Sequence, residues 1–231
     1  MSTVAQSLAA WKSSQCHALE VGGLFSRSKV AHKWKAPFRS LSLRECVSWR
    51  TQDLLEQSLC LYEQEHILGA RILLRSAFET LAVLIYLNQQ TRQVLAGKLN
   101  FHDYSDKTAV LLLGSRDGST QHKALNIVTI LEKCNSRYSG ISELYGALSE
   151  SAHPNCEGTS VGYSNIDHEM HTVAFLNKWK AMYSKNHIDS IILCIKVFFL
   201  EYNEEWSDAF EKLEAWIEAN DTNLEATKRD A

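Results

Sequence analysis

Proline and glycine are scarce in this chain, which has two prolines and ten glycines among 231 residues. Because both residues interrupt regular helices, their scarcity favours long helices over many short strands and turns. Apolar residues make up 45% and charged residues 22% of the chain, as in ordinary soluble globular proteins. A chain of this length can bury a substantial core. The composition therefore predicts an all-α fold.

The chain also lacks paired cysteines and a recognisable secretion signal. Its six cysteines are scattered and form no C-x-x-C pair. The beginning of the chain has neither the basic nor the apolar region of a secretory signal peptide. We therefore expect free thiols in a reducing compartment and a cytoplasmic location.

Membrane spans and a strong basic field are missing as well. The apolar run Ile188–Leu200 is too short to cross a bilayer and contains Asp189 and Lys196. A net charge of -3 differs from the basic balance of dedicated nucleic-acid binders. We expect no membrane association, and any contact with nucleic acid has to be local.

The familiar signatures of nucleotide binding and hydrolysis are also absent. The sequence contains no G-x-x-x-x-G-K-[ST], G-x-G-x-x-G, G-x-S-x-G or H-E-x-x-H motif. Asp167, His168 and His171 place two imidazoles beside a carboxylate, but no further ligand stands at a spacing that suggests a complete metal site. We expect neither a metal nor a cofactor.

The longest apolar run is Ile67–Leu87, which is interrupted only by Arg71, Arg75 and Glu79. In a helix, this spacing of four places the three charged residues in one stripe and leaves the other faces apolar. Such a helix is either a buried core helix or a membrane span, and the charged stripe disfavours the span. The sequence therefore predicts a buried central helix.

The rest of the chain is organised around this central helix. We expect one domain over residues 1–231, with an N-terminal helix and a basic connector in 1–40, a helical core in 41–220 and a disordered tail in 221–231. A first helix is expected to run from its Ser2 or Thr3 cap to Leu19, and residues 155–172 read as a loop. Leu43–His66 and Ser139–Ala152 are expected to pack against the central helix. So is Thr172–Tyr202, near Ile188–Leu200, which is either one long helix or two helices joined near Lys185–Asn186.

The segment Ser26–Arg39 interleaves basic and aromatic residues. Such a pattern can follow a phosphate backbone and stack a base. Alternatively, the segment is a solvated connector whose aromatic residues attach it to the core, since charge runs are usually solvated surface. The residues that would contact nucleic acid are Arg27, Lys33, Trp34, Lys35 and Arg39.

The charged stripe of the central helix has two interpretations. It can be a buried ion-pair network that fixes the register of the helices, with Arg75 paired to Glu79 and Arg71 in need of a partner elsewhere. It can also present a fixed positive charge to a phosphate, since a guanidinium held beside a carboxylate is suited to that task.

The second candidate is the segment Leu148–Asn155, L-S-E-S-A-H-P-N, which ends a predicted helix one turn after Tyr145. Its histidine, His153, stands at a helix C-terminus, where the dipole favours the protonated imidazole. This position suits a general acid, a phosphate contact or a simple helix cap.

The combination of A-R-x-x-x-R-x-x-x-E, at Ala70–Glu79, with L-S-E-x-x-H-P-N resembles a group of bacterial helical proteins. That group is similar to a distant branch of the HEPN superfamily and of abortive-infection proteins, and the resemblance covers residues 43–165. It implies an all-helical bundle, often dimeric, that is associated with RNA cleavage or with defence against phage.

HEPN ribonucleases share an R-x(4–6)-H motif, in which arginine and histidine from two protomers serve attack by a 2′-hydroxyl and stabilise the phosphate without a metal. This chain matches the motif at Arg27 to His32 and at Arg116 to His122. Chance provides about one such match in a chain of this composition. The second match lies in a glycine-rich segment rather than in a predicted helix.

We therefore predict a HEPN-like defence or toxin-type protein that acts on RNA, with RNA, a cognate protein and a second copy as expected partners. Arg71, Arg75 and Asn155 are expected to bind phosphate, Glu79 to orient the arginines, and His153 to act as acid or base. Two alternatives stay open. One is a non-catalytic interaction module, antitoxin-like or a scaffold, with a structural stripe, and the other is a sensor of a nucleotide or small molecule.

Overall fold

The computed structural model describes residues 3–228 and is all-α, as the sequence predicts. These residues fall into two compact units, the first formed by residues 3–14, 49–81 and 135–196 and the second by residues 15–48, 82–134 and 197–228. The helices in chain order are α1 (Val4–Ser13), α2 (Val21–Arg27), α3 (Lys29–His32), α4 (Lys35–Glu63), α5 (Ile67–Leu95), α6 (Phe101–Leu113), α7 (Ile127–Cys134), α8 (Ile141–Ala152), α9 (Trp179–Phe199) and α10 (Trp206–Ala226).

Helix α5 is the buried helix that the apolar run predicts. In the first unit its Leu74, Phe78 and Leu81 are almost wholly buried, and in the second unit Leu84 and Ile85 are fully buried. The helix runs to Leu95, beyond the predicted end at Leu87, because its later turns bury further side chains such as those of Asn88 and Val94. No helix in the described part of the chain is long and apolar enough to cross a membrane.

In the first unit, α1 begins with a capping box. The Thr3 hydroxyl accepts a hydrogen bond from the Gln6 backbone, and the Gln6 side chain accepts one from the Thr3 backbone. Thr3 is therefore the cap, whereas Ser2 lies outside the described residues. The helix ends at Ser13 rather than at Leu19, after Leu8 and Trp11 have provided its buried face.

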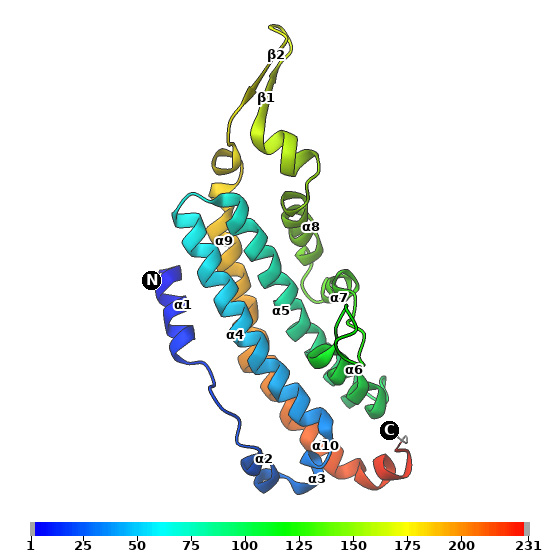
Figure 1. The fold of residues 1–231 in the computed structure, drawn as a ribbon. Coiled ribbons are helices and arrows are strands. Elements are labelled where there is room, and N and C mark those ends of the chain that lie inside the picture. The colour runs from blue at the N-terminus through cyan, green and yellow to red at the C-terminus, as the bar shows by residue number, and fades with distance from the viewer. Residues whose placement is uncertain (1–2, 229–231) are drawn as a thin grey trace. The chain divides into compact units, whose positions relative to one another are not determined.

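The predicted loop 155–172 contains regular structure. A π-helical turn, η1 (Cys156–Val161), follows α8, and strands β1 (Ser164–Asp167) and β2 (Thr172–Phe175) form an antiparallel hairpin. The alternating signal in strands of four residues is too short to stand out in sequence. Because β2 occupies Thr172–Phe175, α9 starts at Trp179 and not at Thr172. Figure 1 shows the hairpin extending beyond the helices of its unit.

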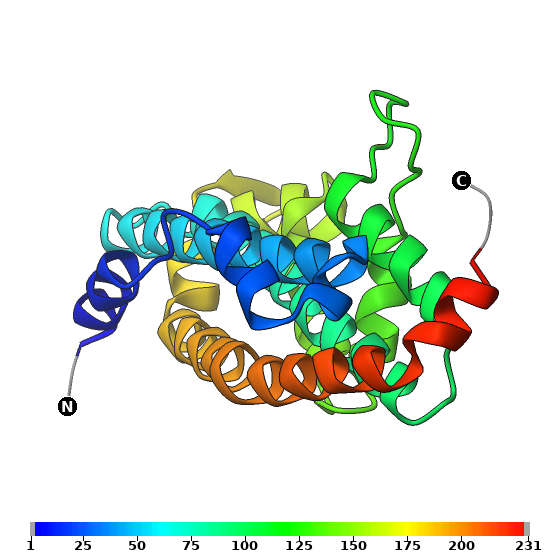
Figure 2. The ribbon, with the colours of Figure 1, turned by 90° about the horizontal axis from the view of Figure 1, so that it is seen from below.

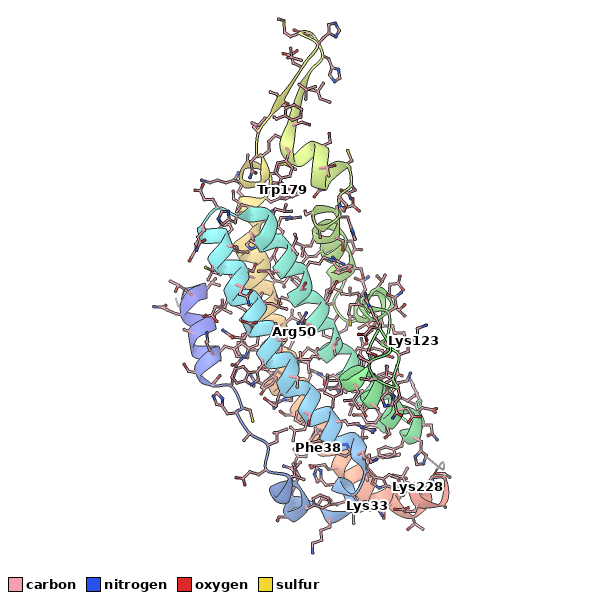
Figure 3. The ribbon with its side chains drawn as sticks, viewed as in Figure 1. Lys33, Phe38, Arg50, Lys123, Trp179 and Lys228 are labelled. Carbon is pink, nitrogen blue, oxygen red and sulfur yellow. The ribbon has the colours of Figure 1, made fainter. Side chains whose placement is uncertain are left out.

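The hairpin joins the helices at Trp179, at the start of α9. A Cβ atom placed on Gly162 would lie 2.7 Å from the Trp179 ring, so this close approach needs glycine. The ring also stacks on Tyr183 one turn later, with ring centroids 5.6 Å apart. Figure 3 shows Trp179 at the base of the hairpin, where its ring packs against Gly162 and Tyr183.

In the second unit, α4 starts at Lys35 rather than at Leu43, because Pro37 falls in the first turn, where proline is tolerated. Helix α10 continues through Ala226 and buries Leu224, so residues 221–226 are helical and not a disordered tail. Residues 229–231 of the predicted tail lie outside the described residues. Figure 2 shows the glycine-containing loop between α6 and α7 extending away from the helices of this unit.

Candidate functional site

The charged stripe of α5 lies in the first unit and faces α8. Arg71, Arg75 and Glu79 follow one another at single-turn intervals, and each has a hydrogen-bond or ion-pair partner that an α8 residue or the stripe itself provides. The sequence prediction that the three share one face is therefore confirmed by their geometry. The two arginines, however, have different surroundings.

The Arg71 side chain makes three contacts within the first unit. Its Nε donates to Ser151 Oγ and its Nη2 donates to the Ala147 carbonyl, both at 2.8 Å. The guanidinium also lies 3.7 Å above the Tyr183 ring of α9. Only 8% of the residue is exposed, and this burial lowers the pKa of the guanidinium. Arg71 thus holds α5, α8 and α9 together within the unit.

The Arg71 contact continues to the segment after α8. Ser151 Oγ, which accepts from Arg71, donates to Glu157 Oε1 at 2.8 Å in η1. Burial and the neighbouring Glu157 carboxylate raise the pKa of the Tyr183 phenol to about 12. The phenol therefore stays neutral at ordinary pH, and the charge of Glu157 raises the pKa of Arg71 against the effect of burial.

Arg75 lies nearer the surface. Its Nη2 donates to Tyr145 Oη at 2.8 Å, and Tyr145 Oη donates to Glu79 Oε1 at 3.0 Å. Arg75 and Glu79 also form an ion pair at 3.1 Å. The side chains of Arg75 and Glu79 are 24% and 25% exposed, so solvent reaches both. These three residues form a half-open polar cluster between α5 and α8.

Two buried polar atoms beside this cluster have no hydrogen-bond partner among the described residues. They are Arg75 Nε and Ser149 Oγ. Ser149 stands one turn after Tyr145 on α8, so the two side chains share a face. Unsatisfied buried polar groups are rare in folded proteins, and the part of the Arg75 guanidinium that solvent reaches could donate to an oxygen of a bound ligand. The cluster is therefore suited to an anionic or hydroxylated ligand.

His153 continues the α8 face that carries Tyr145 and Ser149, one turn further on, where it ends the helix as its C-cap. Its side chain is exposed, and no hydrogen bond to the imidazole occurs in the described part of the chain. The backbone at this point is fixed, because a Cβ atom on Gly158 would lie 2.0 Å from the His153 carbonyl oxygen. The imidazole thus lies in solvent at the end of the α8 face that carries Tyr145 and Ser149.

Asn155, predicted as a phosphate contact, is occupied by local structure. Its Oδ1 accepts from the Gly158 backbone at 2.9 Å, and its Nδ2 donates to Glu150. Asn155 therefore caps the π-helical turn after α8 and stabilises the loop that holds His153.

A second histidine of this unit, His187 of α9, is buried. Ser58 Oγ donates to the Ala70 carbonyl at 2.8 Å, so it accepts the proton of His187 Nε2 at 3.0 Å. The Tyr62 ring stacks on the imidazole, and His187 Nδ1 is buried without a partner in the part of the chain described. Burial and the Arg71 charge lower the pKa of His187 to about 4, so it is a neutral core residue.

The basic-aromatic segment lies in the second unit and is attached largely to α10. Lys33 Nζ pairs with Asp221 at 2.6 Å, and Trp34 Nε1 donates to the same carboxylate at 3.0 Å. Arg39 donates to the Ser105 carbonyl, whereas Lys35 is exposed. Figure 3 shows Lys33 and Lys228 at the same end of this unit. Each ammonium lies 5.6 Å from the Trp34 ring. These contacts favour the interpretation as a connector anchored to the core.

Both residues of the first R-x(4–6)-H match pair with one carboxylate. Arg27 Nη2 lies 2.6 Å and His32 Nε2 lies 2.7 Å from the two oxygens of Glu214 in α10. The side chains of His32 and Glu214 are buried, which closes this pair to solvent. The second match starts at Arg116, which is exposed in the loop between α6 and α7.

We predict that Glu214→Ala destabilises the protein by about 2 kcal/mol, because it leaves the buried His32 ring without its partner and frees Arg27. Urea unfolding followed by circular dichroism measures the change. The control is Glu211→Ala, an exposed glutamate on the same helix. Equal stability of the two variants would contradict a structural role for this contact.

No group of three or more histidine, cysteine, aspartate or glutamate residues that could hold a metal occurs within residues 3–228. Asp167, His168 and His171 lie at the exposed tip of the hairpin. The side chains that could act in the candidate site are therefore those of arginine, tyrosine, serine and histidine.

Residues 138–177, which carry α8 and the hairpin, contain five acidic residues and no lysine or arginine. Arg75 of α5 therefore supplies the positive charge of the cluster.

Comparison with protein-family models, with curated proteins and with solved structures finds no match to this chain. The fold and the site thus define an all-α protein that carries a half-open cluster of Arg75, Tyr145 and Glu79. Sequence reasoning noted Tyr145 but left it out of the site, and it missed Ser149. Ser149 stands four residues and Tyr145 eight residues ahead of His153, and this spacing is the signal that places all three on one helix face.

Proposed function

We propose that the protein acts on RNA as a metal-independent ribonuclease, in the manner of HEPN-like defence or toxin-type proteins. The observation that carries the proposal is the partly exposed Arg75 guanidinium, held in a half-open cluster with Tyr145 and Glu79. An arginine held this way can bind a phosphodiester oxygen through a charge-assisted hydrogen bond. Glu79, acting through Tyr145, orients the guanidinium. Arg71 is a structural residue in this proposal.

His153 is the acid-base group of the proposed reaction. In its neutral form the imidazole accepts the proton of a ribose 2′-hydroxyl, and the 2′-oxygen forms a bond to the adjacent phosphorus. The bond between phosphorus and the 5′-oxygen breaks, and that oxygen takes a proton from water. The products are a 2′,3′-cyclic phosphate and a 5′-hydroxyl end. Arg75 stabilises the charge that develops on the phosphoryl oxygens.

The experiment is incubation of the purified protein with total RNA in EDTA, beside the Arg75→Ala/His153→Ala double variant. We expect the wild type to cleave and the double variant to leave the RNA intact, with 2′,3′-cyclic phosphate ends among the products. Circular dichroism must show that the variant is folded. The matched control is His171→Ala, which removes an exposed histidine outside the cluster.

Failure of the wild type to cleave RNA would overturn the ribonuclease proposal.

The second candidate function is a non-catalytic interaction module, such as an antitoxin-like protein or a scaffold. It is favoured by the hairpin, on which Phe175 is 82% exposed, since exposed apolar surface is typical of protein contacts. In that case the polar cluster would be structural, and a cognate protein would be the partner.

A further inference from the structure

The β1–β2 hairpin of the first unit is nearly unpartnered within its own chain. All residues of its two strands are exposed except Ser164, which is half-buried. A two-stranded hairpin is marginally stable alone and gains stability when further strands or a packed face are added. Pairing with a further strand would therefore stabilise the hairpin.

One face of the hairpin is apolar and uncharged. The register pairs Ser164 with Phe175 and Ile166 with Val173, and directly opposite residues of antiparallel strands share a face. Ile166, Val173 and Phe175 are 53%, 50% and 82% exposed. Such a face can lie beside an identical face in one sheet without placing like charges together.

The outer edge of β2 is open. Leu176 N donates to the Tyr163 carbonyl at 3.0 Å, so these directly opposite residues form a hydrogen-bonded pair. Because such pairs alternate along an antiparallel ladder, the backbone groups of Val173 and Phe175 point away from β1. The outer edge of β1 differs, since Lys178 Nζ donates to the Ser164 carbonyl at 2.7 Å and covers it.

We propose that β2 pairs antiparallel with β2 of a second copy of this chain, across a twofold axis at Ala174. In this register Val173 exchanges both hydrogen bonds with the partner's Phe175, through the outward groups described above. The two hairpins then form one four-stranded sheet whose apolar residues lie on one face. Phe175 of each copy then lies opposite Val173 of the other copy. Each of these two pairs joins an aromatic side chain to a β-branched one, which is a favourable cross-strand contact.

Symmetry and side-chain pairing favour a second copy over an unrelated strand. A strand paired antiparallel with its own copy is self-complementary, as a twofold interface requires. The same pairing sets the exposed Phe175 of each copy against Val173 of the other, and it brings no like charges together because Thr172–Phe175 carries no charged residue.

The interface is small. Two strands of four residues with three apolar side chains on each copy bury less than the ~1,600 Å² of a standard stable complex. We therefore expect a dimer that dissociates at micromolar concentrations. It has to be measured over a concentration series that reaches the hundreds of micromolar.

The first experiment is analytical ultracentrifugation of the full chain over that series. We expect the wild type to shift from monomer to dimer, and Phe175→Glu to remain monomeric because it places a carboxylate in each apolar pair. The control Asn165→Glu adds the same charge to β1 on the opposite face and should still dimerise. A monomeric wild type at all concentrations would overturn the proposal and point to a different partner.

The second experiment tests the register by crosslinking. Ala174→Cys is placed in a background in which Cys16, Cys46, Cys60 and Cys156 are serine, leaving only the buried cysteines. Opposite residues of a non-hydrogen-bonded pair have Cα atoms about 4.5 Å apart, which suits a disulfide. We expect a covalent dimer from Ala174→Cys and none from Asn165→Cys. A dimer that forms with Phe175→Glu and without this crosslink would overturn the register and the surface together.

Discussion

Arg71→Ala is expected to destabilise the protein by about 3 kcal/mol. The substitution removes two hydrogen bonds from a charged donor to buried acceptors, at Ser151 and at the Ala147 carbonyl. Hydrogen bonds of charged groups contribute about 1.5–3 kcal/mol each, and part of that is recovered by water that enters the space. The packing of the guanidinium on Tyr183 is lost as well.

Arg75→Ala is the matched control, because it removes the same side chain one turn later on the same helix. Its ion pair with Glu79 is open to solvent, and such pairs contribute less than about 1 kcal/mol. Urea unfolding of both variants therefore separates a structural arginine from a functional one. A greater loss of stability for Arg75→Ala than for Arg71→Ala would reverse the roles assigned here to the two residues.

The second large effect is a loss of stability in acid that depends on His187. Its pKa is about 4 in the folded protein and near 6.5 in an unfolded chain, so the unfolded state binds the proton more readily between these values. The contribution of neutral His187 to the free energy of unfolding is complete above pH 6.5, and it is lost as the pH drops toward 4. The full difference amounts to about 3 kcal/mol.

His187→Gln tests this directly, because the glutamine amide can still donate to Ser58 but does not titrate. We expect the variant to lose less stability than the wild type between pH 7 and pH 4.5, as measured by thermal unfolding at both values. His168→Gln, at the exposed hairpin tip, should behave as the wild type does. An unchanged pH dependence in His187→Gln would assign the acid sensitivity to other groups.

Periodicity predicted the long, strongly apolar elements of this fold. Ile67–Leu87 was located because its apolar faces extend over many turns, and the stripe spacing predicted that Arg71, Arg75 and Glu79 share a side. The hairpin was missed because four-residue strands carry too little pattern. The predicted start at Leu43 was wrong, because α4 begins at Lys35 with Pro37 in its first turn, where a helix accepts proline.

The candidate site could be predicted only in part, because burial of a side chain depends on contacts distant in sequence. Arg71 and Arg75 have the same neighbours in the sequence pattern, yet Ser151 and Tyr183 enclose the first and leave the second half-open. Likewise, the basic segment around Lys33 looks like a nucleic-acid contact until the acidic side chains of α10 are placed against it.

The absence of lysine and arginine from residues 138–177 has a consequence for how binding would respond to ionic strength. A protein that follows a single-stranded backbone releases a counterion for each phosphate it neutralises, and its affinity falls steeply as salt is added. Here the α8 side of the cluster is acidic, and Arg75 supplies the fixed cation. The logarithm of RNA affinity should therefore fall with a slope of about −0.7 against the logarithm of salt concentration, which corresponds to one phosphate on a single strand. Under the proposed function, RNA would then be selected by the conformation of a single linkage rather than by the charge of a long strand.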